Sequence, residues 1–366
     1  MTTTRHLSRF ALAPVFIGVA CLASPALAQP VFQCEQLELP AGNTPGSWPM
    51  AINRSGAVVG AFGMYGIGDY TPGKWGKTGQ KRPLAYEDGA TGFHLGGIND
   101  DGYATGYNTA WTGPNHDQLP SGYIWSPDGT ASRLTQYQNQ NTAGNSINNA
   151  GVVAGRTSLS STPLLYKATL WEDGAQKYLP PLQAGMAAEA LQINDKDVVV
   201  GWSRLTVDGE QTTHAVKWVN RKAKDLGTLP GHRASAAQAL NTAGVIVGYS
   251  VGVTRQPVAW VNGVIQPLTA DQSAGEALSV NRRGEIVGNT TTRGATYWPQ
   301  AGAEPVALDS VIAADHPCRS AEGAVISLRE ATAINAGGVI VGYGDATTPS
   351  GNHYLAGFKL VPVPAQ

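Results

Sequence analysis

The stretch ALNTAGVIVG, residues 239–248, decides the fold, because six further copies of it run through the chain. Each copy reads Asn-x-x-Gly-x-(small or apolar)-x-Gly, with Asp197 replacing the first glycine in one of them. Successive motif asparagines are 46, 49, 46, 47, 40 and 54 residues apart, and a period near 47 indicates a repeat architecture. The seven motif asparagines are Asn53, Asn99, Asn148, Asn194, Asn241, Asn281 and Asn335.

The composition favours short strands joined by many turns. Charged residues make up 14% of the chain, below the roughly 25% of an average domain, and 45 of the 366 residues are glycine. Short runs rich in Val, Ile and Thr between glycines are typical of an all-β protein. The net charge of −1 offers no basic stripe, so we expect no nucleic-acid partner.

Residues 1–28 predict a secretory signal peptide. Arg5 and Arg9 form a basic start, residues 10–22 are apolar, and Ala26-Leu27-Ala28 is a small-x-small cleavage site. The apolar run is too short to span a bilayer. We therefore expect one mature domain, residues 29–366, that is periplasmic or extracellular, monomeric and without stable membrane insertion.

Each repeat also contains a run that closes in an aromatic residue. Several of these residues precede an Asp-Gly or Asn-Gly pair, a strong signal for a tight hairpin turn. A further run then reaches a leucine. The closing aromatic residues are taken as Tyr86, Trp125, Trp171, Trp218, Trp260, Trp298 and Phe358.

Each repeat therefore predicts four antiparallel strands. Strand a reaches the leucine, strand b ends at the motif asparagine, strand c follows the motif turn, and strand d ends in the aromatic residue. Seven such units predict an all-β, seven-bladed β-propeller of four-stranded blades. An irregular β-solenoid is the alternative.

The strand order also predicts how the ring closes. A blade built as b, c, d and the following a leaves the first strand a, residues 32–39, to complete the last blade and remove its free edge. Cys34 lies in this strand and Cys318 precedes the last blade, so an oxidising compartment permits a disulfide between them. Two free buried thiols are the alternative.

The repeats resemble those of a known family. Runs such as DLGTLPGHRASAAQALNTAGVIVGYS followed by QPVAW are similar to the HAF family of extracellular repeat proteins. The resemblance covers the chain after residue 30 and is strongest in the fifth repeat. It implies secretion and a repetitive β architecture, and it supplies no catalytic residues and no substrate.

The two ends of the predicted blades differ. The b–c and d–a turns are short and lie at one end, while the a–b and c–d loops vary in length and lie at the other. Variable loops on a fixed scaffold usually carry function, so we place the functional face on the loop side. The longest c–d loop is expected between Gly60 and Tyr86, with Tyr70 and Trp75 in it.

Two positions that vary between repeats are candidate sites on that face. The position five before each motif asparagine includes four titratable residues, which we consider as acid–base groups: Glu189, Glu276, Glu330 and His94. Solvated strand ends are the alternative. Trp48 occupies the same position in the first repeat and is considered, with the residues after the second motif glycine, as ligand-binding: Tyr107, Arg156, Trp202, Tyr249 and Tyr343. Structural packing is the alternative for these.

Three residues in the loops complete the candidate set. His116 lies in a c–d loop, and His232 and Arg233 lie in an a–b loop. No HExxH, GxSxG, P-loop or EF-hand motif is present, so we expect no metal and no cofactor.

Two functions remain open on this evidence. The first is a secreted propeller that binds a glycan, a polymer or a protein on the loop face. The second is an extracellular polysaccharide lyase or hydrolase, in which Arg156 or Arg233 neutralises an anionic substrate.

Overall fold

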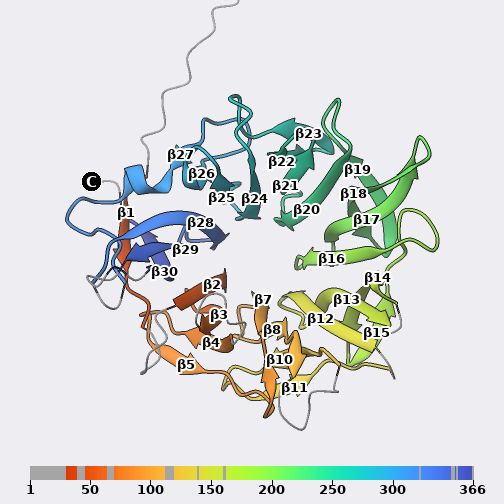
Figure 1. Ribbon diagram of the computed structural model, residues 1–366, viewed down its shortest axis with the longest axis horizontal. Coiled ribbons are helices and arrows are strands. Elements are labelled where there is room, and N and C mark those ends of the chain that lie inside the picture. The colour runs from red at the N-terminus through yellow and green to blue at the C-terminus, as the bar shows by residue number, and fades with distance from the viewer. Residues whose placement is uncertain are drawn as a thin grey trace, which may run out of the picture.

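The computed structural model describes residues 30–38, 46–63, 70–111, 119–137, 140–159, 162–320, 323–347, 351 and 353–364. Over these residues the chain forms seven four-stranded antiparallel sheets, arranged as blades around a central axis (Figure 1). Each blade follows the predicted order b, c, d, a from the axis outward. The seven-bladed β-propeller is therefore confirmed.

The strands of the first four blades are as follows. Blade 1 contains β2 (Gly46–Ile52), β3 (Val58–Gly63), β4 (Thr71–Trp75) and β5 (Lys81–Pro83). Blade 2 contains β7 (His94–Ile98), β8 (Ala104–Tyr107), β10 (Gly122–Trp125) and β11 (Ala131–Arg133). Blade 3 contains β12 (Gln140–Ile147), β13 (Val153–Leu159), β14 (Thr162–Glu172) and β15 (Ala175–Tyr178). Blade 4 contains β16 (Ala188–Ile193), β17 (Val199–Val207), β18 (Glu210–Val219) and β19 (Lys222–Gly227).

The remaining blades complete the ring. Blade 5 contains β20 (Ala234–Leu240), β21 (Ile246–Val251), β22 (Arg255–Val261) and β23 (Val264–Pro267). Blade 6 contains β24 (Gly275–Val280), β25 (Ile286–Thr290), β26 (Gly294–Trp298) and β27 (Val306–Ala307). Blade 7 contains β28 (Ile326–Ile334), β29 (Ile340–Thr347), β30 (His353–Pro362) and β1 (Phe32–Glu35). A small sheet of β6 (Ala90–Thr91) and β9 (Ala110–Trp111) and the 3-10 helix η2 (Leu308–Val311) lie outside the blades.

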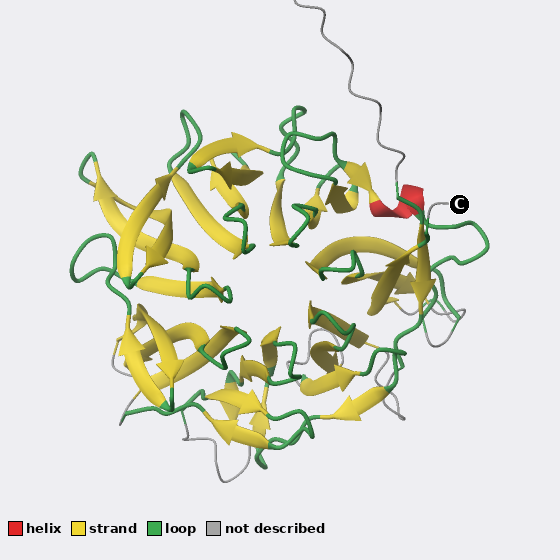
Figure 2. Cartoon of the chain, turned by 180° about the vertical axis from the view of Figure 1, so that it is seen from behind, coloured by secondary structure: helices red, strands yellow, loops and turns green. Residues whose placement is uncertain are grey.

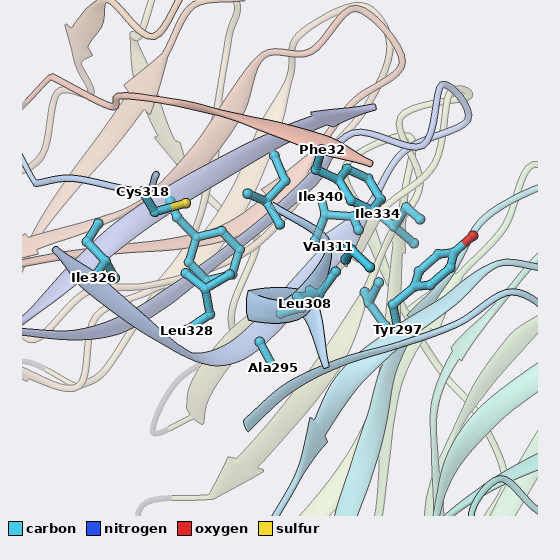
Figure 3. Close-up of a cluster of buried hydrophobic side chains, with 14 of the residues drawn as sticks. Phe32, Ala295, Tyr297, Leu308, Val311, Cys318, Ile326, Leu328, Ile334 and Ile340 are labelled. Carbon is cyan, nitrogen blue, oxygen red and sulfur yellow. The ribbon is translucent and has the colours of Figure 1, made fainter. Parts of the chain in front are cut away.

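The N-terminal strand closes the ring as the sequence predicts. β1 pairs antiparallel with β30, from Phe32 opposite Pro362 to Glu35 opposite Lys359. The disulfide between Cys34 and Cys318 is present, with Cα atoms 5.1 Å apart. Phe32 and Cys318 both belong to the apolar core that joins blades 6 and 7 (Figure 3).

The motif asparagines link all seven blades to one another. In each blade the side-chain Oδ1 accepts a hydrogen bond from the backbone N–H four residues later, as in the bond from Val245 to Asn241. The Nδ2 of the same side chain donates to the backbone carbonyl of the motif asparagine in the next blade, and Asn335 donates back to Asn53. We call this closed circle of seven hydrogen bonds the asparagine belt. The sequence motif did not predict the bond between blades.

The backbone of the motif turns explains the exception in the fourth repeat. Gly244 and its counterparts adopt a positive φ, as the turn requires. Asp197, which stands at this position in blade 4, adopts a φ of 54°. Aspartate tolerates this region better than most residues, so the turn is kept. Figure 2 shows these short turns gathered around the axis.

The closing aromatic residue of the first blade is Trp75 and not Tyr86. Trp75 ends β4 and is fully buried, whereas Tyr86 follows β5 and is 44% exposed. The expected long c–d loop is therefore shorter, because residues 71–75 form β4. The error arose because the Glu87-Asp88-Gly89 turn signal directly follows Tyr86.

The six buried tryptophans join each blade to the blade before it. Each indole Nε1–H donates to a backbone carbonyl at or just after the outer strand of the preceding blade, for example from Trp260 to Leu226 at 2.9 Å. Phe358 fills the same place in blade 7 without a donor. A buried indole needs a hydrogen-bond acceptor, and the neighbouring blade supplies it.

Candidate functional site

The two variable positions singled out in the sequence face each other across strands b and c of every blade. The residue five before the motif asparagine pairs with the residue after the second motif glycine, as in His94 opposite Tyr107 and Glu330 opposite Tyr343. Because strand b is innermost, these pairs circle the axis at the loop face. We call them the mouth ring: Trp48–Ala61, His94–Tyr107, Ala143–Arg156, Glu189–Trp202, Ala236–Tyr249, Glu276–Asn289 and Glu330–Tyr343.

Every inner strand has a β-bulge below the mouth ring. The register shifts around the residue three before the motif asparagine in all seven blades. A bulge re-aims the extra side chain, and here the extra residues line a channel cavity of about 420 Å³. These residues are Met50, Gly96, Asn145, Leu191, Gln238, Leu278 and Thr332.

Aliphatic side chains divide the channel into two parts. The cavity below the mouth ring and a second cavity of about 220 Å³ at the asparagine belt share lining residues. The shared residues directly precede the motif asparagines, so they form an aliphatic constriction between the two cavities. They are Ile52, Ile98, Ile147, Ile193, Val280 and Ile334.

One side of the mouth ring is a stack of rings around Arg156. The Arg156 guanidinium lies 5.3 Å from the ring centre of Tyr107 and 4.7 Å from that of Tyr166. His94 stacks on the other side of the cluster, 5.2 Å from Tyr107. Trp202 meets Tyr166 edge-on at 6.1 Å. Three blades thus contribute a continuous row of planar groups.

Glu189 neutralises Arg156. The two side chains form an ion pair, and Asn145 Nδ2 donates to the same carboxylate oxygen at 2.9 Å. Burial alone would lower the pKa of Arg156, but Glu189 and the Tyr107 hydroxyl hold that pKa above its usual value. Glu189 is only 5% exposed, so its carboxylate is committed to the arginine and the amide.

Glu276 is also held by an arginine. Arg255 Nη1 donates to its Oε2 at 3.0 Å, and the Arg255 guanidinium lies 4.0 Å from the ring centre of Tyr249. Burial raises the pKa of Tyr249, with Arg255 acting in the opposite direction. This part of the mouth ring repeats the arrangement around Arg156 on a smaller scale.

Glu330 and His94 line a separate cavity of about 190 Å³, which we call the side pocket. Trp48 and Tyr70 meet edge-on in its wall, with ring centres 4.9 Å apart. Its lining residues are Trp48, Met50, Ala61, Tyr70, Phe93, His94, Leu95, Glu330 and Tyr343.

The two titratable groups of the side pocket are shifted in opposite directions. Burial raises the pKa of Glu330, and hydrogen bonds from Tyr343 and Asn289 partly oppose this shift. The pKa of His94 is lowered, first by loss of hydration and then by the charge of Arg156. Relative to their ordinary pKa values, both shifts favour the uncharged forms of the two groups.

The remaining sequence candidates lie elsewhere. His232 Nδ1 lies 3.0 Å from Ser250 Oγ. The His232 side chain lines a cavity to which no mouth-ring residue contributes. Arg233 is ion-paired with Glu210 on the surface. His116 lies outside the described residues. Of the four predicted acid–base residues, only His94 and Glu330 line a common pocket.

Sequence reasoning missed the residues that hold the mouth ring in place. Tyr166 and Arg255 come from strands d, and Asn145 is the bulged residue of blade 3. The bulged position varies from repeat to repeat, so the same comparison of copies could have found Asn145. Tyr166 and Arg255 carry no such signal because strands d differ in length.

Neither a metal-binding cluster nor a membrane-spanning helix occurs in the described part of the chain. In the ranges that the structure describes, no three histidine, cysteine or carboxylate side chains are grouped closely enough to hold a metal ion. The same ranges contain no helix with the length and apolar character needed to cross a membrane.

Comparison with known proteins supports the fold alone. No protein-family model matches the sequence, and no curated protein sequence does. The solved extracellular domain of a B. thetaiotaomicron protein, provisionally assigned as a one-component system, has a similar structure, with a TM-score of 0.51 and 8% identity. The match covers 91% of this chain and 40% of that chain, so this chain spans about two fifths of the length of the solved chain.

Proposed function

We propose that this protein is a secreted propeller that binds an extracellular ligand at the mouth ring. The observation that carries the proposal is that the two ends of the channel are built from different kinds of residues. Residues common to all repeats form the asparagine belt, whereas varied aromatic and titratable residues surround the cavity at the loop face. A site built from varied residues on a uniform scaffold is the usual arrangement for recognition.

The disulfide supports secretion. Cys34 and Cys318 are bonded, and stable disulfides belong to oxidising compartments such as the periplasm and the exterior of the cell. The basic and apolar pattern of residues 1–28 agrees with export. We infer a periplasmic or extracellular protein.

The charge pattern of the mouth ring bears on the kind of ligand. Glu189 neutralises Arg156, and Glu276 pairs with Arg255. Neither arginine is therefore an open receptor for the carboxylate or sulfate of an anionic glycan. Tyr107 is already stacked by His94 and Arg156, so the half-buried ring of Trp202 offers the stacking surface here. An uncharged glycan or polymer, or a protein side chain, therefore fits this region better.

A retention assay tests the proposal. We expect the mature chain to be held by at least one member of a panel of neutral and anionic polysaccharides and extracellular proteins. The double variant Tyr107→Ala/Trp202→Ala should lose that retention, while His232→Ala, at a distant cavity, should keep it. Equal retention of the wild type and the double variant would reject the mouth ring as the site.

A second function is favoured by one observation, the presence of both His94 and Glu330 in the lining of the side pocket. A carboxyl group with a raised pKa and an imidazole with a lowered pKa can serve as the general acid and general base that a polysaccharide lyase or hydrolase needs. Glu330→Gln should then abolish product formation while leaving substrate retention in place. The assay follows unsaturated products and new reducing ends, and turnover by Glu330→Gln at the wild-type rate would exclude this chemistry.

A further inference from the structure

We propose that the side pocket binds a small organic cation, an alkylammonium group, with Glu330 as its counter-ion and Trp48, Tyr70 and Tyr343 as its aromatic walls. This inference rests on the proposed binding function and names a ligand class for one part of the mouth ring. It follows from the shape, the charge and the size of the pocket.

The walls of the side pocket suit a cation. The rings of Trp48 and Tyr70 are inclined at 75° to each other and form two adjoining walls of the pocket. Tyr343 lies in the same lining. Aromatic faces are electron-rich and attract a cation by about 0.5–1 kcal/mol when exposed and by about 2 kcal/mol or more when water is excluded. Quaternary ammonium groups are recognised in cages of this kind.

Glu330 is the mouth-ring carboxylate that lacks a cation. Within the described residues, Glu189 and Glu276 pair with arginines, but Glu330 forms no ion pair. Its partners are neutral: Asn289 Nδ2 donates at 2.9 Å, and Tyr343 lies opposite it on the neighbouring strand. No lysine or arginine belongs to the lining of the pocket. A bound cation would supply the missing charge.

The surroundings of Glu330 agree with this role. Burial raises its pKa, the hydrogen bond from Tyr343 lowers it, Glu276 raises it again, and Arg329 on the same strand lowers it. Arg329 itself lies 3.7 Å from Asp345 and is exposed. His94, across the pocket, has a lowered pKa and adds no positive charge near neutral pH. An incompletely hydrated carboxylate gains more from a cation than a solvated one does.

The volume limits the ligand to a small group. The pocket holds about 190 Å³, below the roughly 300–1,000 Å³ of sites that take drug-sized molecules. Apart from Glu330, His94, the tyrosine hydroxyls and the indole N–H of Trp48, the side chains of the lining are apolar. A sugar would leave most of its hydroxyls without partners, whereas a methylated ammonium group needs none.

Calorimetry with choline and with its uncharged carbon analogue, 3,3-dimethylbutan-1-ol, tests the proposal on the mature chain. The two probes share shape and hydroxyl group and differ in charge. We expect choline to bind at least roughly tenfold more tightly, which corresponds to the cation–π and ionic contribution. Equal affinities, or no choline binding, would overturn the inference.

Variants assign the binding to the side pocket. Glu330→Gln and Trp48→Leu should each weaken choline binding roughly tenfold or more, and Glu330→Gln should leave binding of the uncharged analogue unchanged. The exposed Glu304→Gln controls for the loss of a surface charge. Choline affinity in the wild type should fall as the pH is lowered through the pKa of Glu330, because the protonated group no longer attracts a cation. Full choline affinity in Glu330→Gln would reject the site.

The results of the two assays distinguish a failure of this inference from a failure of the proposed function. Retention on the ligand panel that depends on Tyr107 and Trp202, without choline binding, would reject the cation site and keep the binding propeller. Failure of both assays would reject both. Sedimentation with phosphatidylcholine vesicles that free choline displaces would assign the pocket to a lipid headgroup and overturn its assignment to a free cation.

Discussion

At the residue scale, the motif asparagine has two structural tasks. Asn241 Oδ1 accepts from the backbone of its own turn at Ala243 and Val245, while Nδ2 donates to the carbonyl of Asn281 in the next blade at 2.9 Å. Asn241 is 5% exposed, so water cannot replace these bonds. This requirement explains why the residue is shared by all repeats and why it offers nothing to a ligand.

Replacing Asn241 by alanine should therefore destabilise the whole ring. The change leaves buried backbone groups on two blades without partners, at an expected loss of about 1–3 kcal/mol in the free energy of unfolding. Urea denaturation monitored by tryptophan fluorescence measures it. The neighbouring Thr242→Ala should change stability by less than about 0.5 kcal/mol. Equal stabilities of the two variants would contradict the role of the belt.

Glu330 should make stability depend on pH in a defined direction. Burial raises its pKa above the ordinary 4.5, so the folded state holds the proton more tightly than the unfolded chain. Its contribution to stability is therefore fully present below that ordinary value and is lost as the pH rises through the raised pKa. Glu330→Gln cannot titrate, so its stability relative to the wild type should increase from pH 4 towards neutral pH.

Urea denaturation at a series of pH values measures this difference. Glu304→Gln removes an exposed carboxylate and serves as the control. A difference between Glu330→Gln and the wild type that stays constant with pH, or that falls as the pH rises, would contradict the buried setting of Glu330.

At the element scale, a buried tryptophan at the end of strand d connects six of the seven blades to their predecessors. The Trp75 Nε1–H donates to the carbonyl of Glu38 at 2.8 Å, and Glu38 follows β1 of blade 7. It also packs against Phe62, with ring centres 4.6 Å apart. Trp75 thus supplies one of the contacts between blade 1 and the last blade of the ring.

A pair of alanine variants tests the assignment of Trp75. Trp75→Ala should cost about 3–5 kcal/mol, because it empties a fully buried site and removes an interblade hydrogen bond. Tyr86→Ala removes a ring that is 44% exposed and should cost clearly less. Thermal unfolding of the two variants measures the difference, and a larger loss for Tyr86→Ala would restore the original assignment.

The sequence could predict the elements better than the site. The repeat spacing and the Asp-Gly or Asn-Gly turns are local signals that recur along the chain. Together with the leftover strand expected at residues 32–39, they determine the blade order. The mouth ring was found by comparing copies. The arginine partners of Glu189 and Glu276 could not be predicted. The ion pairs Arg156–Glu189 and Arg255–Glu276 each form between neighbouring blades.

At the scale of the whole molecule, three bonds of different kinds close the ring at blade 7. β1 pairs with β30 through the backbone, and Lys359 Nζ donates to Glu35 at 2.6 Å and to the Lys77 carbonyl at 2.6 Å. The disulfide joins Cys34 to Cys318 beneath this pairing. Chain ends that meet in one sheet leave no free edge in the ring.

Removing the disulfide should loosen this closure. The bond joins residues 284 positions apart, and the chain-entropy model assigns it about 5–6 kcal/mol, often less in practice. The variant Cys34→Ala/Cys318→Ala should therefore unfold at a lower temperature and become sensitive to proteases near β1 before the other blades unfold. Limited proteolysis measures this, and cleavage that begins in blades 3–5 would contradict it.

The same disulfide determines how the protein would respond to a pulling force. A load applied between Phe32 and Pro362 passes from Cys34 directly to Cys318, so six of the seven blades lie outside the path of the force. Stretching the oxidised chain would release only the segment after Cys318, about 150 Å, against about 1,100 Å once the bond is reduced. The disulfide therefore limits the extension of the oxidised propeller to roughly one seventh of that of the reduced chain.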